Sequence, residues 1–164
     1  MADSRLVLDL RAGFASGVTV VTFRTDEGLR GITVASFAVV SIAPPLVLVC
    51  IGSELDSAAL VIAFGGFGVS VLSDRQEGLS QRFAGRGPLV DDDFSGVPYF
   101  TRRTGAPLLE GALAWFDCAL ENVYDGGDHR IFLGRVEWGA ENPARPDPLL
   151  YFDRHYGDVT NLRR

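Results

Sequence analysis

The sequence predicts a single-domain, mainly β protein: a β-barrel with a few short helices. Many short segments rich in valine and threonine are separated by turns that contain glycine or proline, as in barrels. The helical segments do not alternate regularly with the strands, which argues against a doubly wound parallel sheet. With 164 residues, 47% of them hydrophobic, and no visible linker or repeat, residues 1–164 are expected to share one core.

The individual elements follow from periodicity and from residues that cap or break structure. Helical spacing, with Ser4 and Ser53 as candidate N-caps and glycines as stops, predicts helices over 4–14, 53–66 and 74–85. A Gly-bearing turn at 26–31 makes 17–37 a hairpin candidate, and residues 86–107 are expected to form a long loop. Strands are predicted over 17–25, 32–42, 46–52 (apolar on both faces and therefore central), 67–73, a strand pair within 107–127, 129–139, and a last strand with a tail over 149–164.

Composition excludes several classes of function. The net charge of −6 disfavours a nucleic-acid partner, and all 15 basic residues are arginine, so no lysine can form a Schiff base or a P-loop contact. Cys50 and Cys118 are isolated from each other and from histidine, which fits neither a structural zinc site nor a redox motif. Charged residues near the N-terminus and Pro44–Pro45 within the longest apolar run argue against a signal peptide and a membrane span, so a cytoplasmic location is expected.

Two glycine-bearing motifs do not support the chemistry they suggest. The segment "GGFGVS" (65–70) lies where a helix ends and a strand begins, whereas a dinucleotide fingerprint follows a strand and opens a helix. The segment "GFASG" (13–17) has its serine one place late for a nucleophile elbow, and no histidine is linked to Ser16. A serine hydrolase is therefore disfavoured.

The segment "TVASFAVVS" (33–41) is a candidate cofactor-binding turn. Thr33, Ser36 and Ser41 place hydroxyls in an otherwise apolar stretch, where they could join backbone N–H groups in a phosphate cradle. Strand propensity and turn capping explain the same residues without a ligand. Arg82, beside Phe83, could add a cationic fork to a phosphate or could be a solvated surface residue.

The two histidines have different surroundings in the sequence. His129 follows Asp128 after two glycines, at the junction of a turn and a strand, where it could face a ligand or could bind a backbone carbonyl. His155 lies in a polar segment and is expected to be exposed. Tyr151 and Tyr156 near it could stack on a planar ligand or pack at an interface.

Five blocks in a fixed order carry a family resemblance: "FASGVTVVT" (14–22), "GITVASFAVVSIAPPLVLVCI" (31–51), "FGVSVLSDRQEGLSQRFAG" (67–85), "GDHRIFLGRV" (127–136) and "PLLYFDRHYG" (148–157). Together they resemble the flavin reductase-like family, the NAD(P)H:flavin oxidoreductases that serve two-component monooxygenases. The resemblance implies a Greek-key split β-barrel that forms a homodimer. It also implies FMN or FAD as cofactor, NADH or NADPH as electron donor, and release of reduced flavin to a partner monooxygenase.

The resemblance also implies a role for individual residues. The residues expected to bind flavin are Thr33, Val34, Ala35, Ser36, Phe37, Cys50, Ile51, Gly52, Ser57, Ala58, Arg82, Phe83 and Ala84. His129 is expected beside the nicotinamide as the catalytic-site residue, with Tyr151 and Tyr156 closing that pocket. Ile32, Ala35 and Ser70 depart from the residues common in the family, and Ala35 removes a polar group that could affect flavin affinity.

Two other functions remain open from the sequence. A non-catalytic flavin-binding or carrier protein could use the same barrel, but it would need neither the GDH turn nor the aromatic C-terminal segment. An oxidase of a phosphorylated cofactor such as a pyridoxine phosphate is disfavoured by the lack of lysine and the few arginines available for a second phosphate site. The sequence does not choose between FMN and FAD, or between NADH and NADPH.

Overall fold

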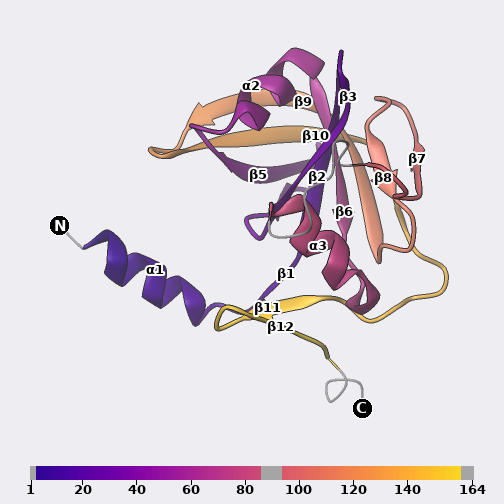
Figure 1. The fold of residues 1–164 in the computed structure, drawn as a ribbon. Helices are drawn as coiled ribbons and strands as arrows, with labels where there is room; N and C mark the ends of the chain where they lie inside the picture. Colours follow the sequence, from indigo (N-terminus) through magenta and orange to yellow (C-terminus); the bar gives the residue numbers. More distant parts are fainter. Residues whose placement is uncertain (1–2, 86–93, 160–164) are drawn as a thin grey trace.

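A seven-stranded antiparallel sheet forms the centre of the protein in the computed structural model, which describes residues 3–85 and 94–159 (Figure 1). The strand order is β3-β2-β6-β9-β10-β5-β4. The strands are β2 (Thr19–Thr25), β3 (Gly28–Val34), β4 (Ala38–Ser41), β5 (Leu46–Gly52), β6 (Gly66–Val71), β9 (Ala114–Asp125) and β10 (His129–Glu141).

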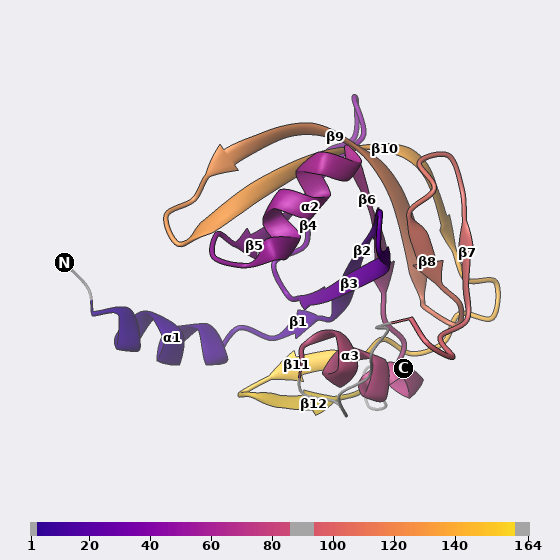
Figure 2. The same cartoon turned by 45° about the horizontal axis from the view of Figure 1, so that its top comes forward.

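The two edge strands of this sheet, β3 and β4, are consecutive in the chain. Only residues 35–37 separate them, and so few residues cannot span a flat sheet seven strands wide. The sheet therefore curls until its edges approach each other, and Figure 2 shows it curving from β3 round to β5. No hydrogen-bonded ladder joins β3 to β4 in the described residues, so the barrel is split along this seam. The predicted mainly β split barrel is confirmed.

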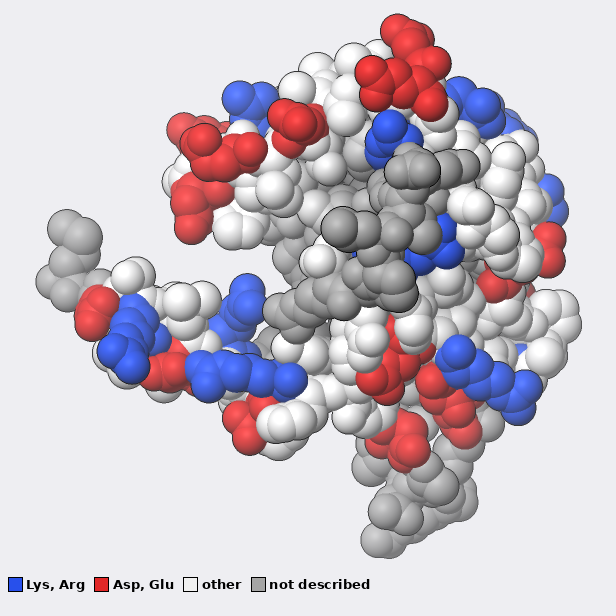
Figure 3. All heavy atoms as spheres, in the orientation of Figure 1, with Lys and Arg blue, Asp and Glu red and all other residues white. Residues whose placement is uncertain are grey.

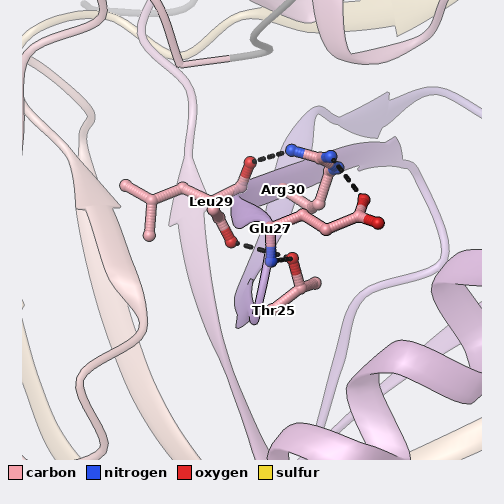
Figure 4. Close-up of polar contacts among 5 residues, drawn as sticks. Thr25, Glu27, Leu29 and Arg30 are labelled. Carbon is pink, nitrogen blue, oxygen red and sulfur yellow. Dashed lines mark hydrogen bonds and ion pairs between the residues drawn. The ribbon is translucent and has the colours of Figure 1, made fainter.

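The β2–β3 hairpin has the tight connection that its glycine predicted. Gly28 has a φ of +136°, which favours glycine, and the Thr25 hydroxyl donates to the Gly28 carbonyl (3.0 Å) and accepts from the Glu27 N–H (3.2 Å). Arg30 donates to the Leu29 carbonyl and pairs with Glu27 (3.1 and 3.4 Å), as Figure 4 shows. These contacts fix the register in which Thr19 faces Val34 at the other end of the hairpin, beside the seam.

The main core lies between the inner face of the sheet and helix α2 (Asp56–Phe64). Val49 and Ile51 of β5, Phe67 of β6 and Phe132 of β10 are almost fully buried there. Phe67 passes so close to β10 that a Cβ atom at Gly134 would lie 2.4 Å from its Cζ atom. The ends of β5 and β10 are thus held by the best-packed part of the molecule.

The predicted helices are present, but two caps differ from expectation. Helix α1 (Ser4–Ala12) is capped by Asp3, which accepts from the Arg5 N–H (3.1 Å), and not by Ser4. Helix α2 follows Leu55, which offers no capping side chain, so Ser53 is not its cap; the Ser53 N–H instead donates to the Asp128 carbonyl (2.9 Å). The predicted stop is correct, because Gly65 ends α2 in the left-handed conformation.

The third predicted helix consists of two parts, a short 3₁₀ turn η1 (Asp74–Gln76) and helix α3 (Glu77–Phe83). The apolar faces of β5 predicted a central strand, but β5 lies next to the edge strand β4. Alternate residues of β5 are buried and half-buried, because one face packs in the core; the end of the other face, at Cys50 and Gly52, borders the pocket described below. None of the helices in the described ranges is long and apolar enough to cross a membrane.

Part of the predicted long loop 86–107 is a strand. Strand β7 (Tyr99–Thr101) pairs with β8 (Pro107–Leu109), while residues 86–93 of that loop lie outside the described residues. The segment 107–127 holds two strands as predicted, but β8 pairs with β7 and not with β9. The connection between β7 and β8 is held to β9 by Asp117, a fully buried carboxylate that accepts from the Thr104 N–H (3.0 Å) and hydroxyl.

The chain ends in a hairpin that the sequence predicted only as one strand and a tail. Strands β11 (Leu150–Phe152) and β12 (His155–Gly157) pair with each other, and β11 also pairs with the short β1 (Ser16–Gly17). Helix α1 precedes β1 and extends away from the barrel (Figure 1). Its last turn is joined to the hairpin, because the Asp153 N–H donates to the Ala12 carbonyl (2.9 Å).

Candidate functional site

A pocket of about 530 Å³ lies at the split of the barrel. Its wall is built by the end of α1, the end of β3 with the turn that follows it, the end of β5, the start of β10 and the β11–β12 hairpin. The predicted site residues that line it are Thr33, Val34, Ala35, Ser36, Cys50, Ile51, Gly52, Ala84, His129, Tyr151 and Tyr156. Segments far apart in the sequence therefore meet in one cavity, of a size typical of ligand sites.

Ser36 fixes the turn between β3 and β4 against β5. Its hydroxyl accepts from the Cys50 N–H (2.8 Å) and donates to the Cys50 carbonyl (3.1 Å). The side chain thus takes the place of a strand neighbour for Cys50, which lies beyond the end of the β4–β5 ladder at Leu48. The hydroxyl hydrogen is used within the protein, so Ser36 shapes the pocket wall rather than donating to a ligand in this arrangement.

Replacing Ser36 with alanine is expected to lower the free energy of unfolding by about 1–2 kcal/mol, because the half-buried Cys50 amide loses its partner. The same change should weaken flavin binding severalfold by loosening the wall. Ser70→Ala is the matched control: Ser70 is fully buried and accepts from the Leu109 N–H (3.0 Å), but it does not line the pocket. Urea denaturation should show a loss in both variants, and flavin fluorescence titration a loss only in Ser36→Ala. Equal flavin affinities in the two would contradict this role.

A chain of hydrogen bonds ties the opposite wall together. The Thr33 hydroxyl donates to the Ser80 carbonyl (2.8 Å), and the Ser80 hydroxyl bonds the Tyr156 hydroxyl (2.8 Å). The Tyr151 ring lies edge-on to Tyr156 with 5.2 Å between centroids. Strand β3, helix α3 and the C-terminal hairpin are therefore linked, so that the two tyrosines hold fixed positions on the pocket wall.

His129 stands at the mouth of the pocket as the first residue of β10, directly opposite Gly52 of β5. Its side chain is 49% exposed, and its Nδ1 lies 2.7 Å from Oδ1 of Asp128. This hydrogen bond and the charge of His129 lower the pKa of the Asp128 carboxyl. The ionised carboxylate can only accept, so Nδ1 carries the hydrogen, and in the neutral form of the ring Nε2 is left as an acceptor. The partner of His129 is thus a carboxylate and not a backbone carbonyl.

Six predicted site residues lie outside the pocket wall: Phe37, Ser41, Ser57, Ala58, Arg82 and Phe83. Phe83 is buried in a second cluster and packs over Gly31, and Phe37 packs against Phe116 with ring centroids 5.1 Å apart. Ala58 is buried in the main core, and Arg82 donates to the Ser95 carbonyl (3.0 Å). Their proposed contacts with a flavin stay predictions.

The sequence reasoning missed the part of the wall that α1 and the hairpin tip provide. Leu8, Arg11 and Phe14 line the pocket, as does Arg154. Helical periodicity predicts a helix but not where it docks, so nothing in the sequence placed α1 at the site. Arg154 carried one weak signal in the sequence: it follows Asp153, and aspartate favours turns. In the structure these two residues form the turn between β11 and β12.

The two cysteines differ sharply in their surroundings. Both are free thiols; Cys50 is half-buried and lines the pocket, whereas Cys118 is fully buried in the main core. Burial, and then the charge of Asp117, raises the pKa of the Cys118 thiol. Cys118 therefore stays protonated and unreactive, and Cys50 is the thiol that a pocket ligand would cover.

Comparison with known proteins agrees with this site. Residues 10–160 match the family described as "Flavin reductase like domain". The reductase subunit HsaB of a flavin-dependent monooxygenase from Mycobacterium tuberculosis is 38% identical over 161 residues, which are 98% of this chain and 83% of HsaB. An NADH-dependent FAD reductase from Streptomyces globisporus is 44% identical over 84% of this chain and 76% of its own length.

Solved structures show the same fold. BorF, the flavin reductase component of a bacterial two-component tryptophan halogenase, superposes with a TM-score of 0.86 at 40% identity, covering 95% of this chain and 98% of BorF. The Streptomyces globisporus NADH:FAD oxidoreductase SgcE6, in complex with NAD and FAD fragments, has a TM-score of 0.89 at 34% identity over 100% of this chain and 99% of its own.

Proposed function

The chain belongs to the flavin reductase-like family, and we propose that it is an NAD(P)H-dependent flavin reductase that passes reduced FMN or FAD to a partner monooxygenase. The observation that carries the proposal is the pocket at the split of the barrel, with a carboxylate-oriented His129 at its mouth. The two Streptomyces globisporus proteins are named for NADH and FAD, which favours NADH and FAD for this chain too.

The residues of the pocket fit a flavin and a nicotinamide nucleotide. About 530 Å³ suits a planar ring system, and apolar side chains such as Val18, Ile32 and Leu55 provide contact area. The end of β5 at Gly52 has no side chain to block close approach of a ring edge to the backbone. When bound, the flavin supplies the redox chemistry, accepting a hydride from the nicotinamide, with a proton taken from solvent.

The protein contributes positioning rather than acid–base chemistry. His129 lines the mouth, and Nε2 of its neutral ring could take a hydrogen bond from the nicotinamide carboxamide and orient that ring. Tyr151 and Tyr156, fixed through Ser80, would help to close the pocket around bound rings and to exclude water. Residues 33–36 and 50–52 hold the flavin through the wall that Ser36 braces.

The proposal includes a homodimer in the cytoplasm. Helix α1 has no buried residue, and its apolar side chains Leu6, Val7, Leu8 and Leu10 are at least half exposed. A nine-residue helix is marginal without packing, so a second copy that covers α1 would stabilise it. Two free cysteines suit a reducing compartment. Sedimentation equilibrium tests the dimer, which a monomer at micromolar concentration would contradict.

The activity itself is tested by NADH and NADPH oxidation in air, with purified protein and added FAD, FMN or riboflavin. Rapid turnover that depends on the flavin is expected and would rank the nucleotide and flavin preferences. Flavin retained on gel filtration without any turnover would contradict the reductase and favour a flavin carrier on the same barrel.

A further inference from the structure

The charged side chains that line the pocket are arginines, in a protein whose net charge is −6. Among the described residues that line the pocket, Arg11 and Arg154 carry charge, and no aspartate or glutamate is present. Arginine side chains also gather at the end of α1 that adjoins the body of the molecule (Figure 3). A cationic lining in an acidic protein selects for an anionic part of a ligand.

Arg154 has a backbone conformation that favours glycine over arginine. Asp153 and Arg154 are the two residues between β11 and β12, with φ values of +48° and +65°. Both angles are positive, as in a type I′ hairpin turn, and the second position of that turn strongly favours glycine. An arginine there destabilises the turn relative to glycine. Since Arg154 is exposed, burial in the core does not compensate for this.

The two chain segments that carry these arginines are bonded to each other. Arg11 belongs to the last turn of α1, and the Asp153 N–H donates to the carbonyl of the next residue, Ala12 (2.9 Å). Nη2 of Arg154 also pairs with Oδ1 of Asp9 at 2.5 Å. Because a guanidinium has five N–H donors and this pair is made through Nη2, Arg154 can bind an anion while Asp9 keeps it oriented.

We propose that Arg11 and Arg154 form a phosphate-binding pair at the mouth of this pocket, and that they bind the pyrophosphate of an adenine dinucleotide, FAD or NADH. This inference rests on the proposed function, because it assumes that such nucleotides enter the pocket. It explains why the turn carries arginine where glycine would be more stable. It also predicts that ligands are discriminated by their phosphates and not only by their rings.

The test is Arg154→Gly, with affinities measured by fluorescence titration for FAD, FMN and riboflavin, and KM measured for NADH. The dissociation constant of FAD, or the KM of NADH, is expected to rise about fivefold, and the substrate affected identifies the pyrophosphate that is bound. Riboflavin, which has no phosphate, should bind as before. The melting temperature should not fall, because glycine relieves the turn. Added salt should weaken binding of that dinucleotide in the wild type more than in the variant.

Two control variants separate phosphate binding from a structural role. Arg145→Gly also removes an arginine with positive φ (+45°) and an ion pair, to Glu141 (3.1 Å), but Arg145 does not line the pocket; it should leave all affinities unchanged. Asp9→Asn breaks the ion pair that joins α1 to the hairpin but keeps both arginines. Because Asp9 only orients Arg154, Asp9→Asn should cost less dinucleotide affinity than Arg154→Gly and none for riboflavin. An equal loss for riboflavin in Asp9→Asn would mean that the ion pair is a latch for α1, and the proposal would be wrong.

The flavin affinities in this test are independent of turnover. If the protein binds flavins but oxidises no NADH, the reductase function fails, whereas the ratio of FAD to riboflavin affinities still tests the arginine pair. Unchanged constants for both FAD and NADH in Arg154→Gly, or an equal loss for riboflavin, would overturn the phosphate-binding role while leaving the reductase intact.

Discussion

Alanine in place of His129 is expected to raise the KM for NADH about tenfold while the affinity for flavin stays within about twofold. The variant removes the acceptor Nε2 at the mouth but leaves the β5 and β3 walls, which hold the flavin in the proposed site, unchanged. His155→Ala is the matched control, because the second histidine is exposed, bonds the carbonyl of Asp153 within the hairpin, and does not line this pocket. NADH kinetics equal to wild type in His129→Ala would remove the role assigned to it.

A graded variant tests whether the tautomer of His129 matters. In Asp128→Asn the amide can donate to Nδ1, so that Nε2 would carry the hydrogen and could no longer accept from the carboxamide. The KM for NADH should rise, but by less than in His129→Ala. Because the ring is half exposed, solvent can accommodate either tautomer, and part of the protein keeps Nε2 as an acceptor. A KM unchanged in Asp128→Asn but raised in His129→Ala would mean that the ring contributes contact area alone.

Valine in place of Gly134 is expected to lower the free energy of unfolding by about 3 kcal/mol or more. A Cβ atom there would lie 2.4 Å from Phe67 Cζ and 2.9 Å from the Cβ of Cys118, and both neighbours are fully buried, so neither can move aside. Because Gly134 and His129 share β10, a shift of the strand also displaces the mouth of the pocket.

The control for this substitution is Gly157→Val on β12, where a Cβ atom meets nothing within 4 Å. It should change stability by less than about 0.5 kcal/mol. Urea denaturation of both variants measures the difference, and a Gly134→Val protein as stable as Gly157→Val would show that the contact between β10 and Phe67 can relax.

The sequence predicts those parts of the fold that depend on local patterns. The β2–β3 hairpin, the stop of α2 at Gly65 and the start of β10 after two glycines follow from turn chemistry and periodicity. The position of β5 beside the edge strand does not, because an apolar second face can contact either another layer of core or a pocket wall. The pairing of β7 with β8 was not predicted either, because the polar residues and the glycines of 94–106 are typical of a loop.

The candidate site could be predicted in part from the order of the family blocks, but its construction could not. That Ser36 binds Cys50 across the seam, and that Tyr156 reaches Ser80, depends on side-chain positions that only the closed barrel brings together. The docking of α1 beside the hairpin places Arg11 with Arg154, more than a hundred residues away in sequence. No local pattern connects such segments.

The measurement that most directly tests whether flavin occupies this pocket is alkylation of the two thiols by N-ethylmaleimide, followed by mass spectrometry with and without FAD. Cys50 should be modified and Cys118 should not, since Cys118 is fully buried and stays protonated. FAD should slow modification of Cys50 in proportion to the fraction of protein that has bound it. Cys50 labelling that saturating FAD leaves unchanged, in a protein that still reduces FAD, would place the flavin elsewhere and contradict the account.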